Sequence, residues 1–311
     1  MKIVITDKIN LDQEGRKKLE QIPGVEIYDD VPTKEQIIDR VKDADIATAW
    51  YIDFTREIIE ATTNLKYIIV PAVGTDWIDH KTAGEKGIKI LNCPTFNSQA
   101  VAEHAIALMF AIKRQIVAAN LAILNGSFNS KDFEGTEVKG KSLVTYGFGN
   151  VGKKVIELAT GLGMQTGYIN TKTSEEDTND LFKKADVLVM CLTLNEHTNK
   201  ILDAGKISLL KKDAVVINVA RGEVIDQDAF YKALTEEKIA GAGIDTFPND
   251  TTIATSSKAT SEILKFAKLP NVVATPHMGF KTKESMQRLG KELIEDIESC
   301  LEGKPINVVN S

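Results

Sequence analysis

The stretch KSLVTYGFGNVGKKVIELATGLG, residues 141–163, decides the fold of this chain. Its first part, SLVTY, has the pattern of a short buried strand, and KKVIELAT has the pattern of a helix. Between them Gly147, Gly149 and Gly152 have the spacing G-x-G-x-x-G. A strand, this glycine pattern and a helix in succession are typical of a turn that binds the pyrophosphate of a dinucleotide. The alternative is that the glycines serve only a tight turn.

Each glycine has its own expected part in such a turn. Gly147 would allow the turn itself, Gly149 would let the pyrophosphate approach, and Gly152 would let the helix pack closely. The lysine–serine/threonine pair of a Walker A motif is missing, so phosphoryl transfer is disfavoured. About twenty residues later an acid would normally bind the ribose 2′-hydroxyl of NAD. Here Asn170 occupies that place, with Lys172 just beyond, which favours NADP(H), or use of both NAD and NADP(H).

On both sides of this stretch, apolar strand patterns alternate with amphipathic helix patterns, which predicts parallel sheets with helices on both faces. The expected strands before it are 2–6, 24–29, 44–50, 66–73 and 89–93; those after its own strand are 165–170, 185–192, 214–220, 239–245 and 271–277. The fold class is therefore α/β, and the length of the chain allows one large or two ordinary domains. Residues 98–126 are expected to form one long helix that bridges the domains, and 248–261 a loop rich in Thr and Ser.

Composition narrows the function classes. The chain has 311 residues, 43% of them hydrophobic, and a net charge of −6, which disfavours nucleic acid and anionic membranes as partners. The three cysteines form no metal-binding pattern, so no metal site is expected. The start, MKIVITDKIN, is typical of a first strand rather than of a signal peptide, and a cytoplasmic location is expected.

Four polar side chains lie at or just beyond the carboxyl ends of the expected strands of the second half: Arg221, Asp245, Asp250 and His277. Ligands bind at the carboxyl ends of strands in open α/β sheets, so these residues are candidates for catalysis. A buried arginine needs an anion to offset its desolvation. The alternative is an ordinary ion-pair cluster. His104 lies on the apolar helix and is expected to be a structural residue.

These motifs together resemble the D-isomer-specific 2-hydroxyacid dehydrogenase family. GFGNVGKKV, INVARGEVID, GAGIDTFPND and TPHMGF are similar to the family's signatures in order and spacing, and AVGTDWIDH and NSQAVAEHAIAL to its substrate-loop and linker-helix segments. The resemblance covers nearly the whole chain. It implies that Arg221 binds the substrate carboxylate and polarises its carbonyl, and that His277 is the acid/base. Asp250 stands where the family usually has a glutamate that pairs with this histidine.

The resemblance also implies the remaining contacts. Val73 and Gly74 would offer backbone N–H groups to the carboxylate, Asn97 would lie on the substrate side, and Asp245 would contact the nicotinamide carboxamide. The complete set of cofactor-binding residues that we expect is Gly147, Phe148, Gly149, Asn150, Val151, Gly152, Asn170, Lys172, Ala220, Asp245 and Gly279. The resemblance implies two doubly wound parallel-sheet domains with an active-site cleft between them. A flavodoxin-like substrate domain would comprise residues 1–98 and 281–311, and a Rossmann-type dinucleotide-binding domain residues 99–280.

The function that follows is an NAD(P)-dependent oxidoreductase of a small 2-ketoacid or D-2-hydroxyacid, similar to glyoxylate, hydroxypyruvate or pyruvate. The long helix resembles the family's dimer-forming segment, so a homodimer is expected. Trp50 and Tyr51 would leave room for only a small or flat substrate, although both could equally be core residues. Two alternatives remain: a dehydrogenase of another small anion, such as phosphite, and a nucleotide-sensing regulatory protein with the same fold.

Overall fold

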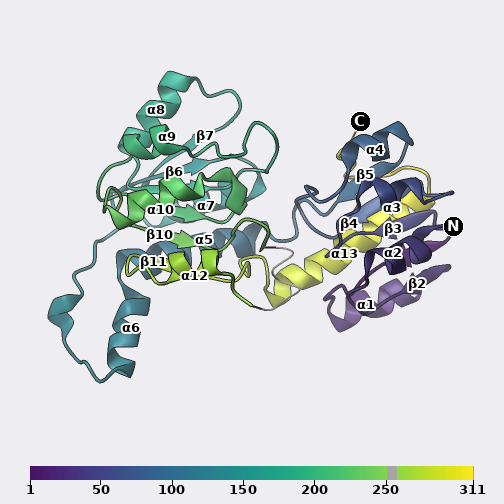
Figure 1. Cartoon of the computed structure of the whole chain (residues 1–311), viewed down its shortest axis with the longest axis horizontal. Coiled ribbons are helices and arrows are strands. Elements are labelled where there is room, and N and C mark those ends of the chain that lie inside the picture. Colours follow the sequence, from purple (N-terminus) through teal and green to yellow (C-terminus); the bar gives the residue numbers. More distant parts are fainter. Residues whose placement is uncertain (251–257, 311) are drawn as a thin grey trace. The chain divides into compact units, whose positions relative to one another are not determined.

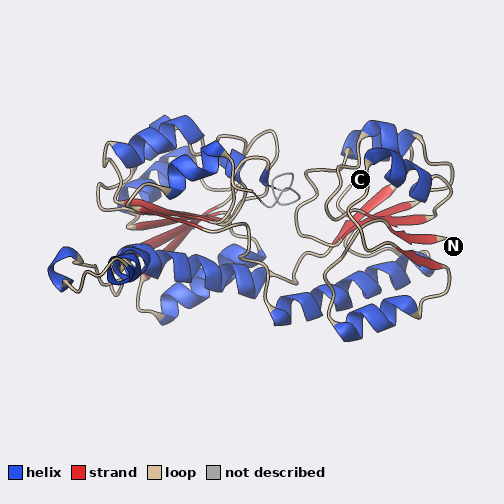
Figure 2. Ribbon diagram, turned by 60° about the horizontal axis from the view of Figure 1, so that its bottom comes forward, coloured by secondary structure: helices blue, strands red, loops and turns tan. Residues whose placement is uncertain are grey.

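The computed structural model describes residues 1–250 and 258–310, so residues 251–257 of the Thr- and Ser-rich loop lie outside the described residues. Contacts divide the chain into two compact units. Unit 1 consists of Met1–Asn97 and Lys281–Ser311, and unit 2 of Ser98–Phe280. Each unit has its own parallel sheet with helices on both faces (Figure 1, Figure 2).

The sheet of unit 1 has the strand order β2-β1-β3-β4-β5. Its strands are β1 (Ile3–Ile5), β2 (Val25–Ile27), β3 (Ile46–Thr48), β4 (Tyr67–Val70) and β5 (Lys89–Asn92). Its helices are α1 (Gln13–Glu20), α2 (Lys34–Val41), α3 (Arg56–Glu60), α4 (His80–Glu85) and α13 (Lys283–Leu301). Helices α2, α3 and α4 pack on one face, and α1 and α13 lie together on the other.

The sheet of unit 2 has the strand order β11-β10-β9-β8-β6-β7. Its strands are β6 (Ser142–Tyr146), β7 (Gln165–Ile169), β8 (Val187–Met190), β9 (Val215–Asn218), β10 (Gly241–Ile244) and β11 (Val272–Ala274). The helices are α5 (Ser98–Lys113), α6 (Ile116–Leu124), α7 (Asn150–Gly161), α8 (Glu175–Lys184), α9 (Ala204–Leu209), α10 (Gln227–Thr235) and α12 (Ser261–Ala267). Helices α5 and α7 share one core with the sheet, and the other face packs against α8, α9, α10 and α12.

The register of unit 2 brings the candidate side chains to one edge. Ile244 at the end of β10 pairs with Asn218 of β9 and with Ala274 of β11. The residues that follow these three strands therefore lie side by side at the carboxyl edge of the sheet. This edge carries the loops of Arg221, Asp245 and His277.

The single long helix predicted over 98–126 is wrong. The structure has α5 and α6, bent by 60° relative to each other. Gln115 between them adopts φ 52°, and its side chain donates to the Glu134 carbonyl. The end of α5 is also tied to a later segment, because the Thr136 N–H donates to the Lys113 carbonyl. The apolar spacing continues through this break, which is why the sequence pattern did not reveal it.

Helix α6 leaves its apolar side chains exposed. None of its residues, all of which the structure describes, is buried. Among them Ile116, Leu121, Ile123 and Leu124 are exposed. Within the described residues, no single helix is long and apolar enough to cross a membrane; α5 and α6 would qualify only as a bent pair, on length and composition.

The C-terminal tail is held against β5. Leu91 and Val308 form an antiparallel bridge, and the Val309 N–H donates to the Ile90 carbonyl. On the α13 side, the Asn307 amide donates to the buried carboxylate of Asp296 over 2.9 Å. The tail therefore extends the sheet of unit 1 and is linked to α13.

Candidate active site

The glycine-rich turn lies beside β6, where the strand order of unit 2 reverses. Gly147 has φ 107°, and a Cβ there would press against the Cys191 carbonyl. A Cβ on Gly152 would collide with the Gly147 carbonyl, so only glycine lets α7 pack this closely. A Cβ on Gly149 would meet no described atom within 4 Å, which leaves open space above the turn.

The start of α7 fits a bound phosphate. The N-cap is Gly149, which has no side chain to satisfy the first N–H groups of the helix. Asn150 begins the helix at the surface, and Val151 packs against the core. The first N–H groups of any α-helix have no partner within the helix, and these groups and the helix dipole favour an anion at such a position. The residues present therefore fit the pyrophosphate of a dinucleotide.

An aromatic pair links this turn to the next strand. The rings of Phe148 and Tyr168 are stacked, with centroids 3.8 Å apart and planes at 10°. The Lys153 ammonium lies 5.8 Å from the Phe148 ring centroid, a cation–π distance. Tyr168 precedes the end of β7 and the Asn170 turn, so the stack connects the two parts of the expected nucleotide site.

Asn170 shapes the turn after β7. Its carboxamide oxygen accepts from the Lys172 N–H at 2.9 Å and from the Thr173 hydroxyl at 3.3 Å. The Thr173 hydroxyl also accepts from the Asn170 N–H. The oxygen is thus directed into the turn. In the described residues the amide nitrogen of Asn170 has no such partner, so the side chain offers donors rather than an acceptor.

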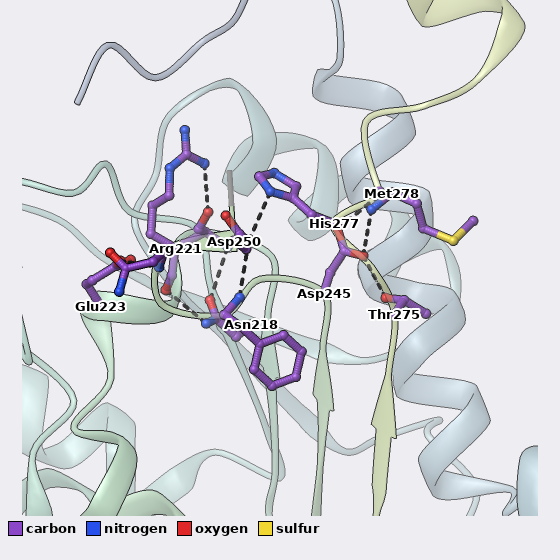
Figure 3. Close-up of polar contacts among 12 residues, drawn as sticks. Asn218, Arg221, Glu223, Asp245, Asp250, Thr275, His277 and Met278 are labelled. Atoms are coloured by element: carbon purple, nitrogen blue, oxygen red, sulfur yellow. Dashed lines mark hydrogen bonds and ion pairs between the residues drawn. The ribbon is translucent and has the colours of Figure 1, made fainter. Parts of the chain in front are cut away.

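The loop that carries Arg221 is shaped by Asn218, the last residue of β9. The buried carboxamide of Asn218 donates to the Arg221 carbonyl over 2.9 Å and accepts from the Ala220 N–H over 3.1 Å. The Arg221 guanidinium donates to the Ala220 carbonyl at 2.9 Å. Ala220 is itself buried. The loop is therefore held by one side chain, and the guanidinium extends beyond the strand end (Figure 3).

His277 and Asp250 form a close pair. Nδ1 of His277 lies 3.0 Å from Oδ2 of Asp250, so the shorter acid reaches the ring. The same Asp250 oxygen accepts from the Phe247 N–H at 3.1 Å, which fixes the carboxylate in its own turn. Because Nδ1 faces Asp250, Nε2 is the nitrogen left to face a substrate. Figure 3 shows His277 and Arg221 at the same edge of the sheet.

Asp245 serves the backbone around His277. Its side chain is 3% exposed and accepts from the N–H groups of Met278 and Gly279 at 3.0 and 2.9 Å. Burial alone would raise the pKa of this carboxyl. Hydrogen bonds from His104, Thr275 and the two backbone N–H groups outweigh that effect, and the Asp245 pKa lies below its usual value. Gly279 is buried in this turn.

In unit 1, Val73 and Gly74 follow β4. Asn92, the last residue of β5, donates its side-chain amide to the Val73 carbonyl over 2.7 Å. In a trans peptide the carbonyl and the next N–H point in opposite directions. Since Asn92 holds the Val73 carbonyl inward, the Gly74 N–H is directed away from β5. This orientation suits an N–H group that binds a ligand anion at the strand end.

Two further features of unit 1 concern residues that the sequence predicted to lie near the substrate. The Asn97 carboxamide oxygen is buried and finds no donor in the described part of the chain. The fully buried Asp7, after β1, accepts from the Tyr51 N–H at 2.6 Å. Burial raises the Asp7 pKa, although this N–H and the Thr6 hydroxyl lower it. Asp7 therefore anchors the loop that carries Trp50 and Tyr51.

Sequence reasoning missed the two asparagines that shape these loops. Asn92 and Asn218 each end a strand that is otherwise apolar at its carboxyl end, as in KILN and VVIN. A carboxamide at the end of a buried parallel strand needs hydrogen-bond partners, and the adjoining loop is the nearest source. An asparagine at the end of an apolar strand could therefore have predicted these loop-shaping residues from the sequence. Arg221, Asp245, Asp250 and His277 lie together in unit 2, whereas Val73, Gly74 and Asn97 lie in unit 1.

Comparison with known proteins identifies the family. The family profile described as "D-isomer specific 2-hydroxyacid dehydrogenase, NAD binding domain" matches residues 106–279. Hydroxypyruvate reductase of Thermotoga maritima is 34% identical over 92% of this chain and 94% of its own length. This chain belongs to the D-isomer-specific 2-hydroxyacid dehydrogenases. The predicted family and the predicted two-sheet α/β fold are therefore confirmed.

Two other similar proteins have different activities. D-3-phosphoglycerate dehydrogenase of Methanocaldococcus jannaschii is 35% identical, and all of this chain matches 59% of its length. A solved acyclic imino acid reductase, in complex with NADPH and D-Arg, has a TM-score of 0.90 and 33% identity; the match covers 99% of this chain and 100% of that chain. The relatives include NAD-dependent 2-hydroxyacid oxidoreductases, and the matched profile is that of an NAD-binding domain, so this chain is expected to bind a nicotinamide cofactor.

Proposed function

We propose that this protein reduces a small 2-ketoacid to the D-2-hydroxyacid, and catalyses the reverse oxidation. The observation that carries the proposal is the pairing of His277 with Asp250 at the strand edge that also bears Arg221. The glycine turn of the same sheet supports it, because it fits a dinucleotide pyrophosphate at the point where the strand order reverses.

Arg221 binds the substrate carboxylate. A guanidinium can make two parallel hydrogen bonds to a carboxylate and still donate toward the adjacent carbonyl oxygen. Asn218 holds the loop backbone so that the guanidinium starts from a fixed position. In unit 1, Asn92 holds the Val73 carbonyl, which supports the proposed use of the Val73 and Gly74 N–H groups in binding a substrate carboxylate. The buried Asn97 carboxamide oxygen has no donor among the described residues, and as an acceptor it suits a hydroxyl of the substrate rather than the carboxylate.

His277 moves the proton. The nicotinamide cofactor, when bound, supplies a hydride to the carbonyl carbon. As negative charge develops on the carbonyl oxygen, Nε2 of His277 donates its proton and an O–H bond forms. The imidazole is charged before this step, and Asp250 at 3.0 Å stabilises that charge. In the oxidation direction Nε2 accepts the hydroxyl proton.

The coenzyme that we propose is NADP(H), or both coenzymes. Asn170 presents amide donors, since its oxygen is bonded within its own turn. Phosphate oxygens are acceptors, and Lys172 adds a nearby positive charge on an exposed side chain. Of the predicted cofactor residues, Ala220 and Gly279 use their N–H groups internally, so we propose that they contribute close packing rather than hydrogen bonds.

A second candidate is reduction of a 2-imino acid, which the similarity to an acyclic imino acid reductase favours. The loops after β3 and β4 add one observation of their own. Burial raises the pKa of Asp53, and the negative charge of Asp76 raises it further. A substrate with a positively charged side chain would relieve this repulsion.

We also propose that the protein is a homodimer, as expected from its sequence. The exposed apolar side chains of α6 support this, because a contiguous apolar surface marks an association site. Figure 1 shows α6 standing away from the sheet of unit 2, in a position to meet another chain.

The deciding experiment is a panel of glyoxylate, hydroxypyruvate and pyruvate, each with NADH and NADPH, with and without ammonium or methylamine. A ketoacid reductase consumes coenzyme without amine, whereas an imino acid reductase requires it. Arg221→Lys should lose at least about tenfold in kcat/KM, roughly 1.4 kcal/mol, because a point charge cannot replace the planar fork. Arg114→Lys, on an exposed arginine of the same unit, is the control. Full activity of Arg221→Lys would contradict the assigned role.

A further inference from the structure

We propose that His104, a residue with no part in the reaction as described, is a positioning residue for His277. It acts through Asp245 and Thr275, which hold the turn that carries the catalytic imidazole. This inference rests on the proposed function of His277 as the acid/base. It is built entirely from contacts within unit 2.

The backbone at His277 needs such support. Its φ is 48°, in the left-handed region that residues other than glycine rarely adopt. The conformation is maintained by hydrogen bonds on both sides. The His277 N–H donates to the Asp245 carbonyl at 2.8 Å, and the next two N–H groups donate to the Asp245 carboxylate. One aspartate thus fixes three consecutive residues.

The Asp245 carboxylate is in turn held from α5. Its Oδ1 accepts from the Thr275 hydroxyl at 2.6 Å and lies 3.2 Å from Nε2 of His104. The same Nε2 lies 3.0 Å from the Thr275 oxygen. Figure 3 shows the Thr275 and Met278 bonds converging on Asp245. His104 therefore contacts both members of the pair with a single ring nitrogen.

The protonation of that nitrogen follows from the hydrogen-bond inventory. A threonine hydroxyl has one proton, and here it goes to the Asp245 carboxylate. The Thr275 oxygen can then only accept from His104. Nε2 of His104 must therefore carry a proton, which both Thr275 and Asp245 attract. This is the arrangement of a donor that orients a carboxylate, not of a ring that merely fills space.

The His104 ring also packs directly against the turn that carries His277. A Cβ on Gly279 would lie 2.9 Å from Oδ2 of Asp245 and 3.0 Å from Cδ2 of His104. The glycine is needed because the carboxylate and the imidazole occupy that space. At 17% exposure, His104 is largely enclosed on the apolar helix α5. Loss of the ring would leave Asp245 with one donor fewer and the turn without its backing.

The test uses variants that separate positioning from packing. His104→Leu removes the donor, His104→Gln restores an N–H at a similar reach, and Thr275→Val removes the hydroxyl at nearly constant shape. Glu103→Gln, at an exposed neighbouring position of α5, is the control. The first readout is hydrogen exchange of the Met278 and Gly279 amides, which does not require activity. The second is kcat and KM for the 2-ketoacid or imino acid that wild type reduces.

In His104→Leu the Met278 and Gly279 amides should exchange at least about tenfold faster, because the Asp245 carboxylate that accepts from them is no longer held in place. kcat should fall about tenfold while KM stays within about twofold, because Arg221 is untouched. His104→Gln should recover most of both, and the double variant His104→Leu/Thr275→Val should lose less than the product of the single losses. Unchanged amide exchange in both His104→Leu and Thr275→Val would overturn the proposal. If wild type reduces no substrate, the proposed function fails, and amide exchange alone still decides whether His104 holds the turn.

Discussion

At the level of single residues, two aspartates contact His277 or its turn in different ways. Asp250 contacts the ring at Nδ1, whereas Asp245 binds the backbone of the turn. The two acids belong to the segment that follows β10. One sets the charge and orientation of the imidazole, and the other sets the position from which the side chain starts.

Asp250→Asn should lower kcat for reduction at least about tenfold, roughly 1.4 kcal/mol, because the His277 ring loses the carboxylate at 3.0 Å that orients Nδ1. Steady-state kcat and KM for the ketoacid measure this. Asp228→Asn removes the same charge from an exposed position of the same unit and should keep the wild-type kcat. A wild-type kcat in Asp250→Asn would exclude the pair from proton transfer.

Asn170→Asp should raise the KM for NADPH about tenfold more than the KM for NADH, because a carboxylate repels the 2′-phosphate. The new side chain keeps an oxygen for the Lys172 N–H and the Thr173 hydroxyl, so the turn is preserved. Comparing kcat/KM for both coenzymes in wild type, Asn170→Asp and Lys172→Ala tests this. A wild type that strongly prefers NADH, unaltered by Lys172→Ala, would contradict the proposed coenzyme.

At the level of elements, the sequence predicted each described strand within a few residues, because apolar runs bounded by turn residues are a local signal. The glycine turn was also predictable, since its spacing and context are both local. The break between α5 and α6 was not predictable, because the contacts that hold it come from residues 134–136. For the same reason the network of His104, Asp245 and Thr275 was hidden: its members are remote in sequence.

The join between α13 and the C-terminal tail contains an acid whose protonation affects stability. Asp296 is 0% exposed. Its pKa is raised to about 7, chiefly by burial, while the Asn307 hydrogen bond lowers it and the charge of Glu292 raises it. In the unfolded chain an aspartate loses its proton near pH 4. Between these values the folded state binds more protons, so the free energy of unfolding falls as pH rises.

Asp296→Asn should remove that slope. Wild type is expected to lose about 1 kcal/mol of stability per pH unit from this group between roughly pH 4 and pH 7. The asparagine variant has no proton to lose and should show a flatter dependence. Urea denaturation at several pH values measures the difference. Glu298→Gln, at an exposed position on the same helix, is the control. If the free energy of unfolding depends on pH in the same way in wild type and Asp296→Asn, then Asp296 does not hold its proton in the folded state.

At the level of the whole molecule, the exposed face of α6 remains to be accounted for. Exposed apolar side chains are individually ordinary, but a helix with no buried residue gains little stability from its own unit. A helix of this length is also marginal alone in water. Packing α6 against the α6 helix of a second chain would stabilise both helices. In a two-fold contact the same apolar surface is buried on each copy.

Leu121→Asp combined with Leu124→Asp, which lie one helical turn apart on α6, should therefore convert a dimer into a monomer. Each carboxylate would be desolvated in the contact without a partner, which opposes association strongly. Light scattering after size-exclusion chromatography, over a range of protein concentrations, measures the mass. Leu264→Asp on α12 is the control, because that leucine is 43% exposed and Leu121 is 51% exposed. The control should keep the wild-type mass. A double variant with the wild-type mass would show that the dimer contact does not involve α6. A monomeric wild type would contradict the proposed homodimer.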